Sequence, residues 1–187
     1  MLYAIENNLL KKVMIKIKKK LINYFSDYKK IIDNYNLNEI SKLLKKLKNF
    51  NKKIIIFGNG GSANIANHIA NDLTNASKIK AISFSDIGMI TCYTNDYGFD
   101  NWVTKAIEYH YEKGDIIILI SSSGMSMNMI NGALKCKKEK KYFVTLSGFN
   151  IKNKLFKFGD CRFFVNSKSY NHVELAHMQI LMSIVDF

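Results

Sequence analysis

The chain has 187 residues, enough for one domain with its own core. Its residues are 48% hydrophobic and 23% charged, a composition that excludes a disordered chain. The formal net charge of +13 would suit a protein that binds nucleic acid. Nearly all of the positive charge, however, comes from lysines, and Arg162 is the only arginine. Because the lysines mostly fall in or beside amphipathic helical stretches, we interpret them as solvated helix faces and expect no nucleic-acid partner.

Two amphipathic helices are predicted at the start of the chain. The first covers Leu2–Phe25 and the second Leu37–Phe50, where Asn38 is a suitable N-cap. The apolar positions of the first recur every three to four residues: Leu9, Leu10, Val13, Ile17, Leu21 and Phe25. Such helices can pack on a sheet or pair with a second subunit, and the pattern alone allows both.

Short apolar strands alternate with helices from residue 52 onward. The predicted strands are Ile54–Phe57, Ala81–Phe84, Ile116–Ile120, Tyr142–Leu146 and Phe163–Val165. The predicted helices are Ser62–Leu73, Ile87–Thr94, Phe99–Glu112, Ser126–Lys138 and Val173–Val185. This alternation indicates an α/β fold whose parallel sheet is covered by helices on both faces. Ligands of such sheets bind beyond the carboxyl ends of the strands.

The first candidate motif is the turn Gly58–Ser62, which follows a strand and opens a helix. Its glycines allow a sharp turn and a close approach to a ligand, and the start of the helix offers free N–H groups to an anion. It is neither a Walker A sequence nor the spaced Rossmann fingerprint. The alternative is a purely structural strand-to-helix turn.

The second candidate motif is Ser121–Ser126, which follows the strand Ile116–Ile120. Four hydroxyls surround one glycine at the start of another helix, an arrangement suited to a phosphate monoester. A third segment, Thr94–Phe99, indicates by its residues only a capped turn before a helix. Two anion-suited turns after two parallel strands together predict a phosphate site.

The three motifs together resemble the signatures of the SIS (sugar isomerase) family, and most closely those of its phosphoheptose isomerases. They occur in the family's order, with His68 six residues after Ser62 and Asn128 after the serine turn. The resemblance implies a flavodoxin-like SIS domain over 1–187, with a five-stranded parallel sheet between helices. Residues 1–50 would form a helical oligomerisation segment, in a tetramer, and residues 51–187 the sugar-phosphate-binding core.

The resemblance also implies a reaction and a substrate site. The reaction is the interconversion of sedoheptulose 7-phosphate and D-glycero-D-manno-heptose 7-phosphate, for bacterial surface polysaccharide such as lipopolysaccharide or capsule. Carried over by position, the substrate-binding residues are Asn59, Gly60, Ser62, Asp96, Ser121, Ser122, Ser123 and Ser126.

The catalytic and metal positions fall on two helices. His68 and Asp72 are four residues apart and so lie on one helix face, as a metal site or an acid–base pair requires. By resemblance Asp72 is the catalytic base, one methylene shorter than the family's glutamate. Glu174 takes a metal-ligand position beside His68 and Asp72, and His177 is a candidate acid.

The chain departs from the family at its second catalytic histidine. That position falls on Met182, or on Gln179 in an alternative register that puts Asn171 at the other ligand position. A thioether is a poor zinc ligand beside oxygen donors and transfers no proton, so we expect weak zinc binding and no other cofactor. The loop Thr74–Lys80 is also shorter than in the family and lacks its arginine.

Two other functions remain open at this point. The chain could be a SIS protein that binds a phosphosugar or serves as an adaptor without turnover, or an isomerase of another sugar phosphate. In all three cases we expect a cytoplasmic homo-oligomer without a membrane partner. No apolar stretch reaches the roughly 20 residues of a membrane span, and three cysteines without a CxxC pair indicate reduced thiols.

Overall fold

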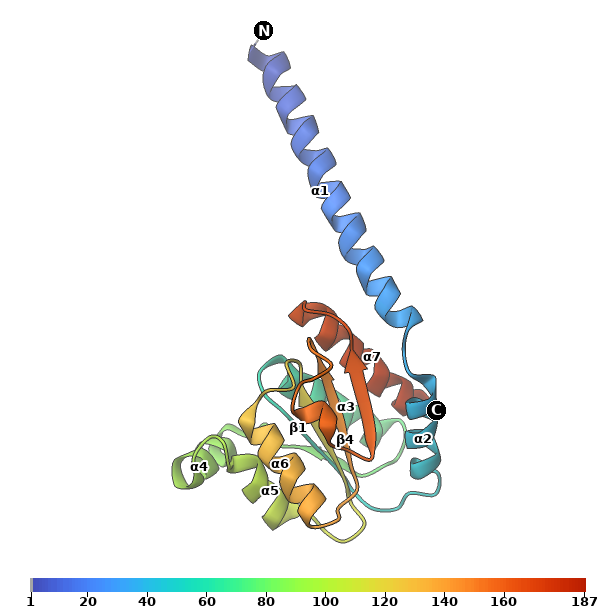
Figure 1. Cartoon of the computed structure of the whole chain (residues 1–187), viewed down its shortest axis with the longest axis vertical. Helices are drawn as coiled ribbons and strands as arrows, with labels where there is room; N and C mark the ends of the chain where they lie inside the picture. Colours follow the sequence, from blue (N-terminus) through green and yellow to red (C-terminus); the bar gives the residue numbers. More distant parts are fainter. Residues whose placement is uncertain (1) are drawn as a thin grey trace. The chain divides into compact units, whose positions relative to one another are not determined.

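The computed structural model describes the backbone of residues 2–187 and the side chains of residues 10–187. The chain divides after Tyr35 into a helical unit and a larger unit, Asn36–Phe187 (Figure 1). In the described residues no helix is both long enough and apolar enough to cross a membrane.

The helical unit consists of α1, Leu2–Asp33, which continues eight residues beyond the predicted end at Phe25. No glycine or proline interrupts this stretch, so nothing in the backbone stops the helix there. Of the predicted apolar stripe, Leu9 lies outside the described side chains. The other members are exposed by 46–65% within the chain: Leu10, Val13, Ile17, Leu21 and Phe25.

The larger unit begins with α2, Leu37–Leu47. Its N-cap is Asn36, not Asn38 as predicted: the Asn36 side chain accepts a hydrogen bond from the Glu39 N–H at 3.2 Å. The helix buries Leu43 and Leu47, and it packs against the last strand and the last helix of the same unit. It ends three residues before the predicted Phe50, and Asn49 then turns the chain with a φ of 61°.

Within the described residues the larger unit forms one five-stranded parallel sheet in the order β2-β1-β3-β4-β5. The strands are β1 (Ile54–Gly58), β2 (Ala81–Ser83), β3 (Ile116–Ser121), β4 (Phe143–Gly148) and β5 (Cys161–Val165). This is the flavodoxin-like strand order, so the predicted fold class is confirmed.

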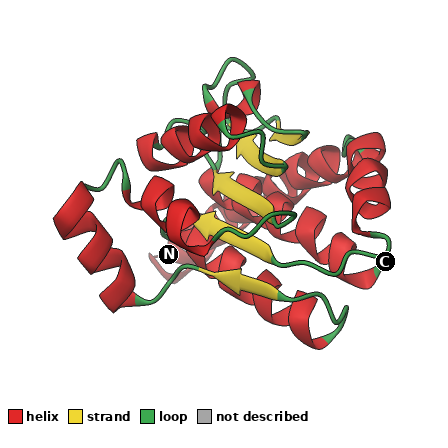
Figure 2. Ribbon diagram, turned by 90° about the horizontal axis from the view of Figure 1, so that it is seen from below, coloured by secondary structure: helices red, strands yellow, loops and turns green. Residues whose placement is uncertain are grey.

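Helices cover both sides of these strands (Figure 2). They are α3 (Gly61–Asn75), α4 (Ile87–Tyr97), α5 (Trp102–His110), α6 (Met127–Lys138) and α7 (Tyr170–Asp186), with a short 3-10 helix at Leu155–Lys157. α5 packs against α6, and α3 packs against α7. The central strands β1 and β3 are buried along their whole length, as apolar runs covered on both faces are, whereas the edge strands β2 and β5 are partly exposed.

A core cluster lies between the central strands and the α5–α6 layer. It joins Phe57 of β1 and Leu119 of β3 to Trp102 of α5 and Met129 of α6, and each of these side chains is at most 1% exposed. The rings of Phe57 and Trp102 meet edge to face, with their centroids 5.9 Å apart. Burial of this apolar area is the main force that holds the layer on the sheet.

The segment Thr94–Phe99 differs from its predicted form. Its first four residues are the last turn of α4, which ends at Tyr97 and is capped by Gly98 with a φ of 79°. α5 starts only at Trp102, because the Asn101 N–H donates to the Gly98 carbonyl in an intervening turn. The motif is therefore the end of one helix rather than a turn that opens the next.

Candidate functional site

The two Gly- and Ser-rich turns lie next to each other because their strands pair in register. β1 and β3 are hydrogen-bonded neighbours, with Gly58 opposite Ile120 at their carboxyl ends. The turn Gly58–Ser62 and the turn Ser121–Ser126 therefore leave the sheet side by side, each leading into a helix.

A cavity of about 140 Å³ lies between these turns. Six of the predicted substrate-binding residues line it: Asn59, Ser62, Ser121, Ser122, Ser123 and Ser126. Gly60 lies in the first turn with a φ of 52°. Tyr170 and Glu174, from the first turns of α7, complete the wall. The sequence predicts that the serines meet at this edge of the sheet, whereas Tyr170 has no signal in its local sequence.

The serine turn keeps several polar groups available for a ligand. The Ser121 hydroxyl donates to the Ser126 hydroxyl at 3.0 Å, and Ser123 accepts from the Met125 N–H at 3.2 Å. Ser126 is the N-cap of α6 but makes no side-chain cap bond. The Ser122 hydroxyl is buried, 6% exposed as a residue, and finds no hydrogen-bond partner among the described residues. A buried hydroxyl without a partner costs free energy, which a bound anion would recover.

Asn153 supports the serine turn from behind. Its amide donates to Ser147 Oγ at 3.1 Å and to the carbonyls of Gly148 and Asn150, and its carbonyl oxygen accepts from the Phe156 N–H at 2.8 Å. Gly124 packs directly on this side chain: a Cβ there would lie 2.1 Å from Asn153 Oδ1, and its φ is 64°. Only glycine suits this position, because its φ is positive and because a side chain would collide with Asn153. No sequence pattern around Asn153 predicts this role, because the contact with Gly124 exists only in the folded chain.

Glu174 lies at the phosphate-suited cavity rather than beside His68 and Asp72. A Cβ built on Gly61 would meet Glu174 Oε2 at 2.4 Å, so the glycine lets the carboxylate approach the start of α3. A carboxylate at this place can accept hydrogen bonds from hydroxyl groups of a ligand.

His68 and Asp72 form the expected pair on α3. His68 Nε2 lies 3.1 Å from Asp72 Oδ2, and their side chains are 47% and 36% exposed. His68 follows Gly61 by seven residues, so it shares that face of the helix about 10 Å farther along the axis. Neither residue lines the cavity between the turns.

The predicted zinc ligands do not assemble within this chain. Among the side chains described, no group of three or more His, Cys, Asp or Glu residues could hold a metal ion. Glu174 lies at the cavity, while His68 and Asp72 pair with each other two turns away. Gln179 and Met182, the two positions considered for the missing histidine, lie on exposed parts of α7. Within the described single chain, His68, Asp72 and Glu174 therefore do not form a zinc site.

His177 does not lie at the cavity, contrary to its predicted use as an acid. It is completely buried, and its Nε2–H donates to the Ser147 carbonyl at 3.2 Å. Since a carbonyl only accepts, this bond fixes the Nε2-protonated tautomer. Nδ1 is buried without a partner in the described structure. Burial lowers the pKa of His177 from 6.5 to about 4, so the ring is neutral at pH 7 and lacks the second proton that a general acid would give.

Asp96 also lies away from the cavity. It sits on the last turn of α4, exposed, where Oδ1 accepts from the Asn95 amide at 3.0 Å. Within the described single chain, Asp96 therefore does not line the cavity where the sugar hydroxyls were expected.

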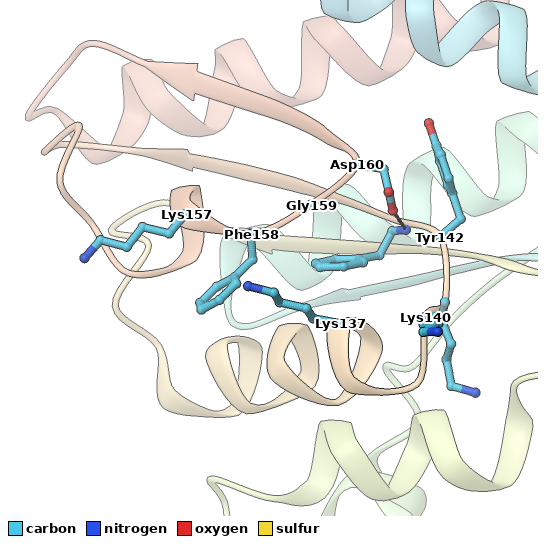
Figure 3. Close-up of a pocket in the computed structure, with 9 residues that line it drawn as sticks. Lys137, Lys140, Tyr142, Lys157, Phe158, Gly159 and Asp160 are labelled. Carbon is cyan, nitrogen blue, oxygen red and sulfur yellow. Dashed lines mark hydrogen bonds between the residues drawn. The ribbon is translucent and has the colours of Figure 1, made fainter.

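A second cavity, of about 400 Å³, lies at the opposite end of the sheet, before β4 and β5 (Figure 3). Its lining includes Lys137, Lys140, Lys141 and Lys157. Lys137 Nζ lies 5.5 Å from the centre of the Phe158 ring, and Lys141 pairs with Glu139 at 3.0 Å. The amines of Lys140 and Lys157 point away from each other (Figure 3). The lysines do not converge on one point, so the cavity between the two turns is the stronger candidate.

We predict that His177 makes the protein less stable in mild acid. Its folded pKa lies below the unfolded value, so as the pH falls through 6.5 toward 4 the unfolded chain takes up the proton first and stability is lost. Between pH 7 and pH 5 this costs about 2 kcal/mol of unfolding free energy. Denaturant unfolding at both pH values should show that His177→Gln loses less stability than the wild type. His110→Gln serves as the control, and an equal loss in wild type and His177→Gln would refute the assignment.

Comparison with known proteins shows which family the chain resembles. Residues 23–148 match the model of the SIS domain. The phosphoheptose isomerase of Fusobacterium nucleatum subsp. nucleatum is 36% identical over 156 residues, which cover 79% of this chain and 80% of the relative. The phosphoheptose isomerase of Sulfurimonas denitrificans is 34% identical over 180 residues, covering 91% and 92%.

A solved structure agrees at the level of the fold. Phosphoheptose isomerase GmhA from Neisseria gonorrhoeae superposes with a TM-score of 0.81 at 21% identity, covering 91% of this chain and 98% of that one. The chain therefore belongs to the SIS domain family, in its phosphoheptose isomerase branch.

Proposed function

We propose that the cavity between the two turns binds the phosphate group of a sugar phosphate. The observation that carries the proposal is the buried, unpartnered Ser122 hydroxyl at the start of α6, within a turn of further serines. The positive end of the α6 dipole and its free N–H groups favour an anion at the same place. Glu174 lines the same cavity beside the first turn, where it would accept hydrogen bonds from sugar hydroxyls.

We propose further that the chain is a phosphosugar isomerase that interconverts sedoheptulose 7-phosphate and D-glycero-D-manno-heptose 7-phosphate. Relatives 34–36% identical carry the name phosphoheptose isomerase. The stripe of α3 that begins at Gly61 supports this substrate, because it leads from the phosphate cavity to His68 over about 10 Å, with Asp72 one helical turn farther along. An extended seven-carbon chain held by its terminal phosphate would bring its first carbons near that pair.

In this proposal Asp72 is the base that takes a proton from one of the first two carbons and returns it to the other through an enediolate, while a second proton passes from one substrate oxygen to the other. The bond from His68 Nε2 to one carboxylate oxygen orients Asp72 and leaves the other oxygen for the proton. In its charged form His68 has a second N–H, on Nδ1, which can stabilise negative charge on the substrate oxygen.

A second candidate is a SIS protein that binds a phosphosugar without turnover. The burial of His177 favours it, because the histidine predicted as a substitute acid has no access to a ligand. An isomerase of another sugar phosphate would use the same phosphate cavity, and a different sugar would change only the contacts along α3. If the substrate is the heptose phosphate, the product would serve surface polysaccharide synthesis in the cytoplasm.

We also propose that the chain works as a homo-oligomer, with a tetramer as the expected state. The apolar side chains of α1 support this, since a stripe exposed by 46–65% within one chain is stabilised when a second copy covers it.

For the phosphate cavity we predict that Ser122→Ala weakens phosphate binding without weakening the fold. The hydroxyl has no partner to lose in the described structure, so the unfolding free energy should stay equal or rise. Affinity for inorganic phosphate and for sedoheptulose 7-phosphate should fall about tenfold in isothermal titration, the loss of one charge-assisted hydrogen bond. Ser183→Ala is the control, because that hydroxyl bonds the Ile180 carbonyl within α7. Wild-type affinity in Ser122→Ala would contradict the site.

For the chemistry we predict that Asp72→Asn lowers kcat on sedoheptulose 7-phosphate at least 100-fold, because the amide cannot accept the proton. Binding of the substrate should change far less, since the phosphate cavity is intact. Asp100→Asn, an exposed substitution outside the site, is the control. The assay is run with and without added zinc. Binding without turnover by the wild type in both buffers would favour the non-catalytic candidate.

For the assembly we predict that Ile17→Glu with Leu21→Glu reduces the oligomer measured by light scattering. Burying two carboxylates in an apolar interface is costly, whereas Lys18→Glu with Lys20→Glu should leave the size unchanged. Removal of residues 1–35 should likewise give a smaller or less soluble species. A wild-type monomer at micromolar concentration would overturn the proposal.

A further inference from the structure

We propose that Asn128 is a positioning residue that fixes the orientation of Asn59 for the recognition of sugar hydroxyls. The inference rests on the proposed sugar-phosphate site and adds a residue that never touches the ligand. Asn128 lies on the first turn of α6 and is fully buried, at 0% exposure, whereas Asn59 lines the cavity.

The two side chains form a reciprocal pair of amide hydrogen bonds. Asn59 Nδ2 donates to Asn128 Oδ1 at 3.0 Å, and Asn128 Nδ2 donates to Asn59 Oδ1 at 3.0 Å. Asn59 belongs to the turn after β1 and Asn128 to the helix after β3. The pair therefore joins the two turns that enclose the cavity.

A third hydrogen bond decides which way both amides face. The Met129 N–H donates to Asn128 Oδ1 at 3.0 Å, and a backbone N–H can only donate. The atom that faces it must therefore be the oxygen of Asn128, which leaves Nδ2 to face Asn59. Asn59 must in turn present its oxygen to that nitrogen, so a flip of either amide would break hydrogen bonds.

After these bonds the Asn59 amide can still make one hydrogen bond as a donor and one as an acceptor. Its Nδ2 has one hydrogen and its Oδ1 one lone pair beyond those used by Asn128. Adjacent donor and acceptor sites of fixed orientation suit the hydroxyl groups of a sugar, which both donate and accept. A dianionic phosphate monoester has no hydrogen to donate and can use only the Asn59 donor, whereas a sugar hydroxyl can use the donor and the acceptor together.

The test is a double-mutant cycle with Asn59→Ala and Asn128→Ala, measured by isothermal titration with two ligands. With sedoheptulose 7-phosphate, each single variant should bind about tenfold more weakly. The double variant should also bind about tenfold, not 100-fold, more weakly, because Asn128 acts only through Asn59. With inorganic phosphate Asn128→Ala should stay within about twofold of the wild type. Asn131→Ala, on the exposed side of α6 where its amide donates to the Asp100 carbonyl, is the matched control.

The titrations distinguish failure of the positioning role from failure of the proposed function. Unchanged sugar-phosphate affinity in Asn128→Ala, or additive losses in the double variant, would overturn the positioning role while leaving the site intact. Equal losses for inorganic phosphate would also overturn it, because they would show a general disturbance of the turns. Failure of the wild type to bind either ligand would instead refute the proposed function. If Asn128→Ala does not fold, Asn128→Leu gives the same test, since leucine has nearly the same shape, carries no charge and removes both hydrogen bonds of the pair.

Discussion

The in-register parallel pairing of β1 with β3 is the constraint on which the rest of the site depends. Parallel neighbours end at the same edge of a sheet, and Gly58 lies opposite Ile120 there. The turns that follow the two strands therefore begin within one residue of the same height, at Asn59 after β1 and at Ser122 after β3. A slip of one residue would turn every side chain of β3 to the opposite face and would separate the serine turn from the glycine turn. The buried apolar faces of both strands make such a slip costly.

Much of this arrangement can be predicted because it depends on local patterns. Apolar strands alternating with helices indicate a parallel sheet, and the ends of neighbouring parallel strands meet, so the sequence alone places the serines near Asn59 and Ser62. The spacing of four between His68 and Asp72 likewise requires one helix face. Helix ends are less predictable: Asn36 and Asn38 are both good N-caps, and only the packing of the buried leucines of α2 decides between them.

Other features depend on how helices rotate against the sheet, which periodicity leaves open. His177 lies three residues after Glu174, yet one enters the core and the other reaches the cavity. Much of the surface of α7 is apolar, so its sequence pattern does not predict which of these two residues is buried and which faces the cavity. Sequence reasoning misses Asn153 and Asn128 as supports of the turns for a related reason. Asn128 follows the serine motif in the sequence, but its pairing with Asn59 of the other turn is known only from the fold, and so is the packing of Asn153 under Gly124.

The packing of Trp102 has a practical consequence for any study of this protein. It is the only tryptophan of the chain, is 1% exposed, and lies against Phe57 of the strand that leads into the first turn. Tryptophan emission therefore has a single source, located in the core of the larger unit and not in α1. Loss of that core would expose the indole to water and shift its fluorescence. One spectroscopic signal thus reports on the sheet beneath the site without labelling.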